Sequence, residues 1–209
     1  MSNSEYQKKA IDHYLLSIID AKKAYVLLKS LCLSRCPEIV GEKLCEKYIW
    51  VWKQHNDFFG IVEHCAASTF ITKILHGFDD SDPQDRPLTL KDIDQNAYTN
   101  FVNEEQNKKI LDQFRELRNK RIAHYDKEGS DSNFPPFNEI DAFFERLEKF
   151  YDALIAEIEG ASVIRKQDQD LKQSIEKVFQ NLYSGEKNRL LQINMEYLWN
   201  KDPKKISSR

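Results

Sequence analysis

The residues best suited to chemistry lie together in one heptapeptide, Arg118-Asn119-Lys120-Arg121-Ile122-Ala123-His124. The imidazole of His124 titrates near neutral pH, so this side chain can give or take a proton under cellular conditions. The guanidinium of Arg118 stays protonated and offers a planar fork that matches phosphate oxygens. The amide of Asn119 can orient either a phosphate or the histidine. A fixed cation, an amide and a titratable base are the groups that phosphodiester cleavage needs.

These groups favour RNA cleavage without a metal ion or other cofactor. The 2'-hydroxyl of the substrate would be the nucleophile, with His124 as general base or acid. Arg118 would stabilise the charge of the pentacoordinate phosphate, and DNA, which lacks the hydroxyl, would be spared. We therefore predict that the catalytic residues are Arg118, Asn119 and His124. A structural interpretation stays open, because the helix dipole favours basic residues and histidine at a helix C-terminus without any function.

The spacing of these residues raises a geometric problem. On a straight α-helix, Arg118 and His124 would lie ~120° apart around the axis and ~9 Å apart along it. Either the helix ends before His124, or groups from elsewhere complete the site. Arg121 is a closer helical neighbour of His124, because residues three apart lie on one face.

Charge around the heptapeptide points to a local contact with nucleic acid. The whole chain has a formal net charge of −3, so it is not a polycation. Residues 115–127, however, hold five Lys or Arg against two acidic residues. Affinity for phosphate grows with the number of cations placed against it. Four residues of this segment are therefore expected to bind RNA: Arg115, Lys120, Arg121 and Tyr125.

The elements that must position the heptapeptide are helices. Only 6 Gly and 6 Pro occur in 209 residues, and apolar residues recur at spacings of three and four over long segments. No strand-like alternation and no internal repeat occurs. The pattern predicts helices over residues 4–33, 38–76, 94–123, 138–158 and 163–199. We expect an all-α fold, an antiparallel up-and-down bundle of about five long helices with short connections.

Two details of this prediction concern boundaries. The segment 38–76 is either one helix or two, since Gly41 and Gly60 are weak points. Along the chain, we assign residues 1–160 to the bundle and 161–200 to a C-terminal helical extension, packed on the bundle or on a dimer of it. Residues 201–209 form a basic tail that we expect to be disordered.

The sequence favours a cytoplasmic protein. No stretch reaches the ~18 consecutive apolar residues of a membrane span, and the N-terminus lacks the basic and then apolar layout of a signal peptide. The four cysteines are then expected to be reduced. Zinc binding is an alternative for Cys32 and Cys36 with His64 and Cys65, but a structural zinc site needs two close ligand pairs. We expect buried or half-buried thiols.

The heptapeptide also carries a family resemblance. Arg118-Asn119 with His124, at a gap of five positions and at the end of a helix, resembles the HEPN superfamily (higher eukaryotes and prokaryotes nucleotide-binding). The longer string from Leu117 to Asp126 looks like the AbiU-type branch, which is associated with phage abortive infection. The segment from Ile74 to Asp80, followed by Leu88-Thr89-Leu90, is similar to a helix end and loop of that branch. The resemblance covers residues 10–155 in layout.

This resemblance implies a metal-independent endoribonuclease that acts as a toxin or antiphage effector. It equally admits a non-catalytic HEPN module that binds a nucleotide, RNA or a protein. Members usually form homodimers in which the two motifs face each other, which would complete the site from a partner subunit. The resemblance also suggests a cognate antitoxin. Some relatives carry a modifiable tyrosine two residues after the histidine, whereas here Tyr125 is adjacent and Asp126 takes that position.

A third interpretation is a helical interaction protein without affinity for RNA. In that case Trp50, Trp52 and Trp199 would lie at an interface with another protein. Aromatic residues at helical spacing are more often part of a core, where their large apolar surface is buried.

Overall fold

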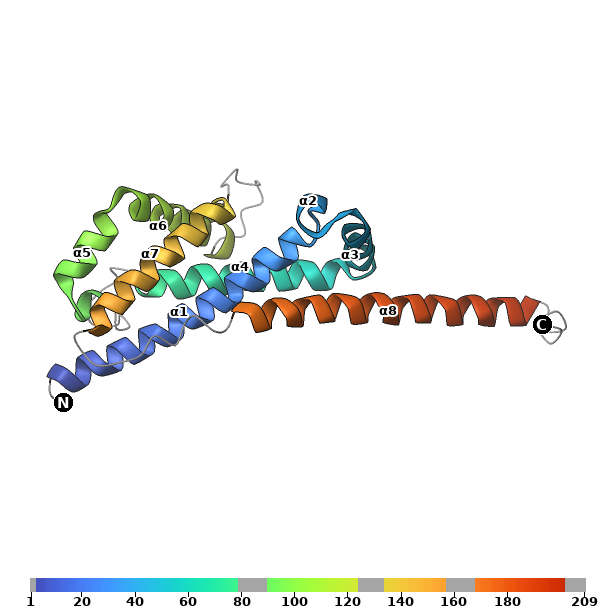
Figure 1. Ribbon diagram of the computed structural model, residues 1–209, viewed down its shortest axis with the longest axis horizontal. Coiled ribbons are helices and arrows are strands. Elements are labelled where there is room, and N and C mark those ends of the chain that lie inside the picture. The colour runs from blue at the N-terminus through green and yellow to red at the C-terminus, as the bar shows by residue number, and fades with distance from the viewer. Residues whose placement is uncertain (1–2, 79–89, 124–133, 157–167, 202–209) are drawn as a thin grey trace. The chain divides into compact units, whose positions relative to one another are not determined.

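The computed structural model describes residues 3–78, 90–123, 134–156 and 168–201, and every regular element in these ranges is helical (Figure 1). The predicted all-α class is therefore confirmed. The α-helices are α1 (Asn3–Leu33), α2 (Pro37–Val40), α3 (Glu42–Gln54), α4 (Asn56–His76), α5 (Gln95–Asn103), α6 (Glu105–Leu117), α7 (Phe137–Ala156) and α8 (Asp168–Lys201). A short 3₁₀ helix, Leu90–Asp92, precedes α5, and a π-helical turn, Arg118–Ala123, follows α6.

Two of the expected long helices are each divided. Residues 38–76 belong to α2, α3 and α4, because Gly41 takes a left-handed φ of 82° between α2 and α3, a conformation that suits glycine. The next break falls at His55 and not at Gly60, which lies inside α4. In the segment 94–123, Glu104 is extended and separates α5 from α6.

The chain divides into two compact units, and each is assembled from separate stretches of sequence. The larger unit comprises residues 1–29 and 63–168, and the smaller unit comprises residues 30–62 and 169–209. Helices α1 and α4 contribute to both. The expected domain boundary at residue 160, and residues 202–209 of the expected tail, lie outside the described residues.

Aromatic side chains form much of the core of the larger unit. Phe70 of α4 has its ring 5.0 Å from that of Phe114 in α6 and 5.8 Å from that of Phe144 in α7. Phe114 also contacts Phe143, at 6.0 Å. Burying one such side chain contributes about 1.5–3 kcal/mol. These contacts hold α6, the helix that leads into the heptapeptide, against α4 and α7.

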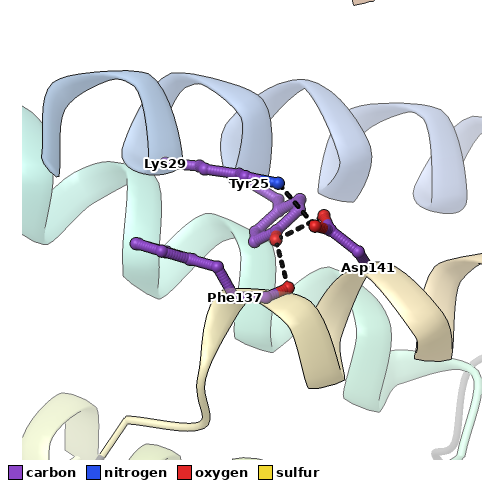
Figure 2. Close-up of polar contacts among 4 residues, drawn as sticks. All are labelled: Tyr25, Lys29, Phe137 and Asp141. Atoms are coloured by element: carbon purple, nitrogen blue, oxygen red, sulfur yellow. Dashed lines mark hydrogen bonds and ion pairs between the residues drawn. The ribbon is translucent and has the colours of Figure 1, made fainter. Parts of the chain in front are cut away.

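A polar joint connects α1 to α7 (Figure 2). The hydroxyl of Tyr25 lies 2.7 Å from Asp141 Oδ1 and 3.0 Å from the carbonyl oxygen of Phe137, while Lys29 Nζ donates to Asp141 Oδ2 at 2.5 Å. Burial, followed by the hydrogen bond and charge of Asp141, raises the pKa of Tyr25 well above its ordinary value. The hydroxyl therefore stays protonated and remains a donor.

The corner between α5 and α6 is held by a buried asparagine. Asn107 Nδ2 donates to the carbonyl oxygen of Phe101 at 3.0 Å and to Glu104 Oε2 at 2.9 Å. Its amide oxygen accepts from Arg146 Nε of α7 at 2.7 Å. Because both ends of the amide are satisfied, its burial is not penalised, and the corner is fixed against α7.

The smaller unit has its own aromatic core. Phe179 of α8 stacks on Phe59 at 5.3 Å and lies 4.7 Å from Tyr48 of α3. Trp52 stacks on Phe59 at 4.7 Å, and the guanidinium of Arg35 lies 4.2 Å from the Trp52 ring. Trp52 is therefore a core residue, whereas Trp50 is half-buried. The side chain of Trp199 is outside the described residues.

Helix α4 bears on the expectation of no membrane span. Among the described residues, α4 is the single helix that is long and apolar enough to cross a membrane, judged by length and composition alone. Core helices of soluble proteins meet the same criterion, and α4 supplies the buried residues Phe59, Phe70 and Ile74.

All four cysteines are thiols and not disulfides. Cys45 is buried, and Cys32 and Cys36 are half-buried, as expected. Cys65 is exposed, in contrast to that expectation. Within the described ranges, no three His, Cys, Asp or Glu side chains gather as metal ligands would.

Candidate functional site

The heptapeptide begins where α6 leaves the core. The apolar face of α6 is buried, and its last residue, Leu117, is 1% exposed. The next residue, Arg118, is half-buried, and Asn119 and Lys120 are exposed. The buried leucine therefore anchors the point at which the polar residues emerge.

From this point the helix changes its winding. Residues Arg118–Ala123 form a π-helical turn, in which hydrogen bonds join residues five apart instead of four. The chain therefore does not continue as a straight α-helix from Arg118 to Ala123. Such turns are rare and are often found at functional sites. His124 and Tyr125 lie outside the described residues, and Arg121 is described only by its backbone.

The structure brings Arg118 and Asn119 together. Arg118 Nε donates a hydrogen bond to Asn119 Oδ1 at 3.2 Å. This contact orients the guanidinium through its Nε edge. A cation that is already oriented can stabilise developing charge with little reorganisation during reaction.

Lys120 forms an ion pair one turn back along the helix. Its Nζ lies 2.5 Å from Glu116 Oε1, and both side chains are about half exposed. Pairs of this kind on a helix surface contribute only about 0.3–0.5 kcal/mol. Lys120 could therefore exchange this carboxylate for a phosphate at small cost, so the ion pair does not oppose the predicted RNA contact.

Arg115 makes two hydrogen bonds within the protein near the heptapeptide. Its Nη2 donates to the carbonyl oxygen of Phe78 at 3.2 Å, and its Nη1 donates to Asp112 Oδ1 at 2.8 Å. Phe78 lies just after the end of α4 and is fully buried. Arg115 thus connects the end of α4 to α6, and its predicted contact with RNA stays a prediction.

The sequence pattern did not reveal that Gly77 and Tyr14 support this connection. A Cβ atom placed on Gly77 would lie 1.7 Å from Cε2 of the fully buried Tyr14. The absence of a side chain at Gly77 therefore lets the α1 tyrosine pack against the end of α4. The glycine before Phe78 was the available sequence signal, but its partner is 63 positions away in the chain.

The end of α4 is joined to α6 shortly before the heptapeptide. The two motifs that suggested the family resemblance begin near Ile74 and Leu117, and the hydrogen bond from Arg115 to Phe78 joins the first motif to α6 just before the second. Residues 79–89, which include part of the first motif, lie outside the described residues.

Comparison with known proteins gives one family. The family model HEPN_AbiU2, described as AbiU2, matches residues 67–179, just over half of the chain. The matched segment runs from within α4 through α6, the heptapeptide and α7 into α8. No curated protein and no solved structure matches the chain.

Proposed function

Because the chain belongs to the AbiU2 family of the HEPN superfamily, we propose that it is a metal-independent endoribonuclease acting as a toxin or antiphage effector. The observation that carries this proposal is the position of the Arg118-Asn119 pair. It lies inside the segment matched by the family, at the start of a π-helical turn, with the guanidinium oriented by the asparagine.

The proposed reaction transfers a phosphoryl group within the RNA. A base, His124 of one subunit, removes the proton of the 2'-hydroxyl, and O2' forms a bond to phosphorus. The bond from phosphorus to O5' breaks, and a protonated imidazole returns a proton to O5'. The products are a 2',3'-cyclic phosphate and a 5'-hydroxyl. Arg118 stabilises the extra negative charge of the pentacoordinate phosphate.

A homodimer would supply the groups that one subunit lacks. We propose that two copies of the heptapeptide face each other, so that each site takes Arg118 from one subunit and His124 from the other, and the same imidazole takes the proton of the 2'-hydroxyl and returns it to O5'. Arg115, Lys120, Arg121 and Tyr125 of both subunits would then contact the RNA backbone. We propose a cytoplasmic location, where RNA substrates occur, and control by a cognate antitoxin.

Cleavage of cellular RNA in the presence of EDTA tests the activity. The wild-type protein is expected to cut, with cyclic phosphate at the new 3' ends, and His124→Ala is expected to lose ~100-fold or more of the rate, as general acid–base catalysis predicts. The control is His64→Ala, which removes an exposed histidine of α4. Absence of cleavage, equal cleavage by His124→Ala, or dependence on a divalent ion would refute the proposal.

A non-catalytic HEPN module is the second candidate. It is favoured by the finding that Arg115 already holds Asp112 and the carbonyl oxygen of Phe78, which leaves one cation fewer for the RNA. In this case labelled RNA or nucleotide would bind to the wild type without turnover, and Arg118→Ala would weaken the binding.

A further inference from the structure

A surface hollow of about 530 Å³ lies between α3 and α8 within the smaller unit. We call it the α3–α8 hollow. Its residues combine aromatic rings, ammonium groups and two leucines. They are Lys43, Glu46, Lys47, Trp50, Tyr183, Lys187, Leu190 and Leu191.

The spacing of these residues explains why two helices build one hollow. On α3, Glu46 and Lys47 lie three and four positions after Lys43, and Trp50 lies four and three positions after them, so the lining residues form one stripe. The opposite side of α3 is buried, through Tyr48 and Val51. On α8 the lining begins at Tyr183, one turn after Phe179, whose ring lies 4.7 Å from that of Tyr48. The packing of Phe179 therefore sets the two stripes beside each other.

Two aromatic rings form one wall of the hollow. The rings of Trp50 and Tyr183 meet edge to face, with centroids 5.6 Å apart. Lys47 Nζ lies 5.3 Å from the Tyr183 ring. Both aromatic residues are half-buried, so part of each ring remains exposed. Exposed indole and phenol rings are surfaces on which nucleobases stack without regard to sequence.

The positive charge of the hollow comes from three lysines. Five lysines elsewhere in the described residues pair with carboxylates, and these are Lys22, Lys29, Lys73, Lys109 and Lys120, while Lys53 and Lys177 of the same two helices do not. Among the described residues, no carboxylate pairs with Lys43, Lys47 or Lys187. Glu46 is the one acidic residue in the lining. The hollow therefore has an excess of positive charge that an anion would neutralise.

We propose that the α3–α8 hollow binds single-stranded RNA, with a base stacked on Trp50 or Tyr183 and the flanking phosphates on Lys43, Lys47 and Lys187. Leu190 and Leu191 would contact the ribose or the edge of the base. Duplex RNA does not fit this chemistry, because its base faces are covered by stacking. The choice of RNA over another anion rests on the proposed ribonuclease function, and the hollow would serve that function by holding substrate outside the catalytic motif.

Binding is measured by fluorescence anisotropy of a labelled single-stranded RNA, with His124→Ala as the background so that no substrate is consumed. Trp50→Ala should weaken binding roughly 5- to 150-fold, the range found when one stacked base is lost. Trp50→Phe, which keeps an aromatic surface, should restore most of the affinity. Circular dichroism establishes that each variant is folded.

The charge contribution is tested with lysines that have no other role in the described fold. Lys43→Gln/Lys187→Gln should reduce the slope of log affinity against log salt by about 1.4, since each phosphate contact in a single strand contributes about 0.7. The control is Lys53→Gln/Lys177→Gln, which removes the same charge from exposed positions of the same two helices, outside the hollow. This control should leave affinity nearly unchanged.

Three outcomes would overturn the proposal. They are an equal loss in the control pair, binding of duplex RNA as tight as that of a single strand, and binding of a mononucleotide as tight as that of the strand. Failure of the ribonuclease proposal is recognised separately. Absence of cleavage with hollow-dependent RNA binding refutes only the enzyme. Cleavage with unchanged KM and affinity in the Trp50→Ala and Lys43→Gln/Lys187→Gln variants refutes only the hollow.

Discussion

At the scale of the residue, the surroundings of the heptapeptide depend on contacts that support the fold. Arg115 fixes the carbonyl oxygen of Phe78, and Gly77 makes room for Tyr14 beside it. The first contact connects the end of α4 to α6, which leads into the heptapeptide, and the second connects it to α1. A substitution at Gly77 should therefore lower the stability of the fold, and it should lower activity only as a consequence of that loss.

Gly77→Ala is expected to destabilise the protein by about 1–3 kcal/mol, the usual cost of overpacking a filled core. The reason is the 1.7 Å approach between the new Cβ and the Tyr14 ring. Urea unfolding measures the change. The control is Gly60→Ala, inside α4, where nothing lies within 4 Å of the new Cβ and helix propensity predicts stabilisation of about 0.5–1 kcal/mol. Equal effects of the two substitutions would contradict this account.

At the scale of the element, the joint between α1 and α7 depends on a hydroxyl that must stay protonated. Because the pKa of Tyr25 is higher in the folded protein than in the unfolded chain, the unfolded chain binds fewer protons above pH ~10. The free energy of unfolding therefore falls as the pH rises above that value. Burial likewise raises the pKa of Tyr151, whose hydroxyl contacts the carbonyl oxygen of Ile11 on α1.

Tyr25→Phe is expected to lower the free energy of unfolding at neutral pH by about 1.5–3 kcal/mol, because a hydrogen bond to a charged carboxylate is lost. Above pH ~10 the variant should lose stability less steeply than the wild type, since one tyrosine no longer ionises on unfolding. Denaturation at a series of pH values between 7 and 11 measures both effects. Parallel curves for the two proteins over that range would contradict the assignment.

At the scale of the whole molecule, we propose a dimer whose catalytic groups come from both subunits. In a two-fold symmetric dimer, a site that takes Arg118 from one chain and His124 from the other can be repaired by mixing two inactive variants. In a mixed dimer of Arg118→Ala and His124→Ala, one of the two sites would then be intact.

Co-expression of Arg118→Ala and His124→Ala should therefore recover about a quarter of wild-type cleavage, because random assortment makes half of the dimers mixed and each mixed dimer holds one intact site. Each variant alone should be inactive. The rate is measured on purified, co-expressed protein, with its mass checked by light scattering. No recovery in a preparation shown to contain mixed dimers would mean that each site lies within a single chain.

The sequence by itself determined the helical class and the start of the site. Helical periodicity is a local property, so the apolar residues of α6 predicted both its buried face and the emergence of Arg118 and Asn119 at its end. Local pattern marked two weak points, of which Gly41 is a break, with a left-handed φ that suits glycine, whereas Gly60 lies inside α4. The family resemblance likewise depended on adjacent residues, and the match over residues 67–179 confirmed it.

Only the tertiary structure determined which contacts the ends of these helices make. Residues Arg118–Ala123 wind as a π-helical turn instead of continuing the α-helix of α6. The contacts of Arg115 with Phe78 and of Tyr14 with Gly77 join residues 37 and 63 positions apart. The α3–α8 hollow arises because Phe179 packs on Tyr48. Contacts of this kind depend on which helix faces meet, and periodicity along one helix does not specify its partner.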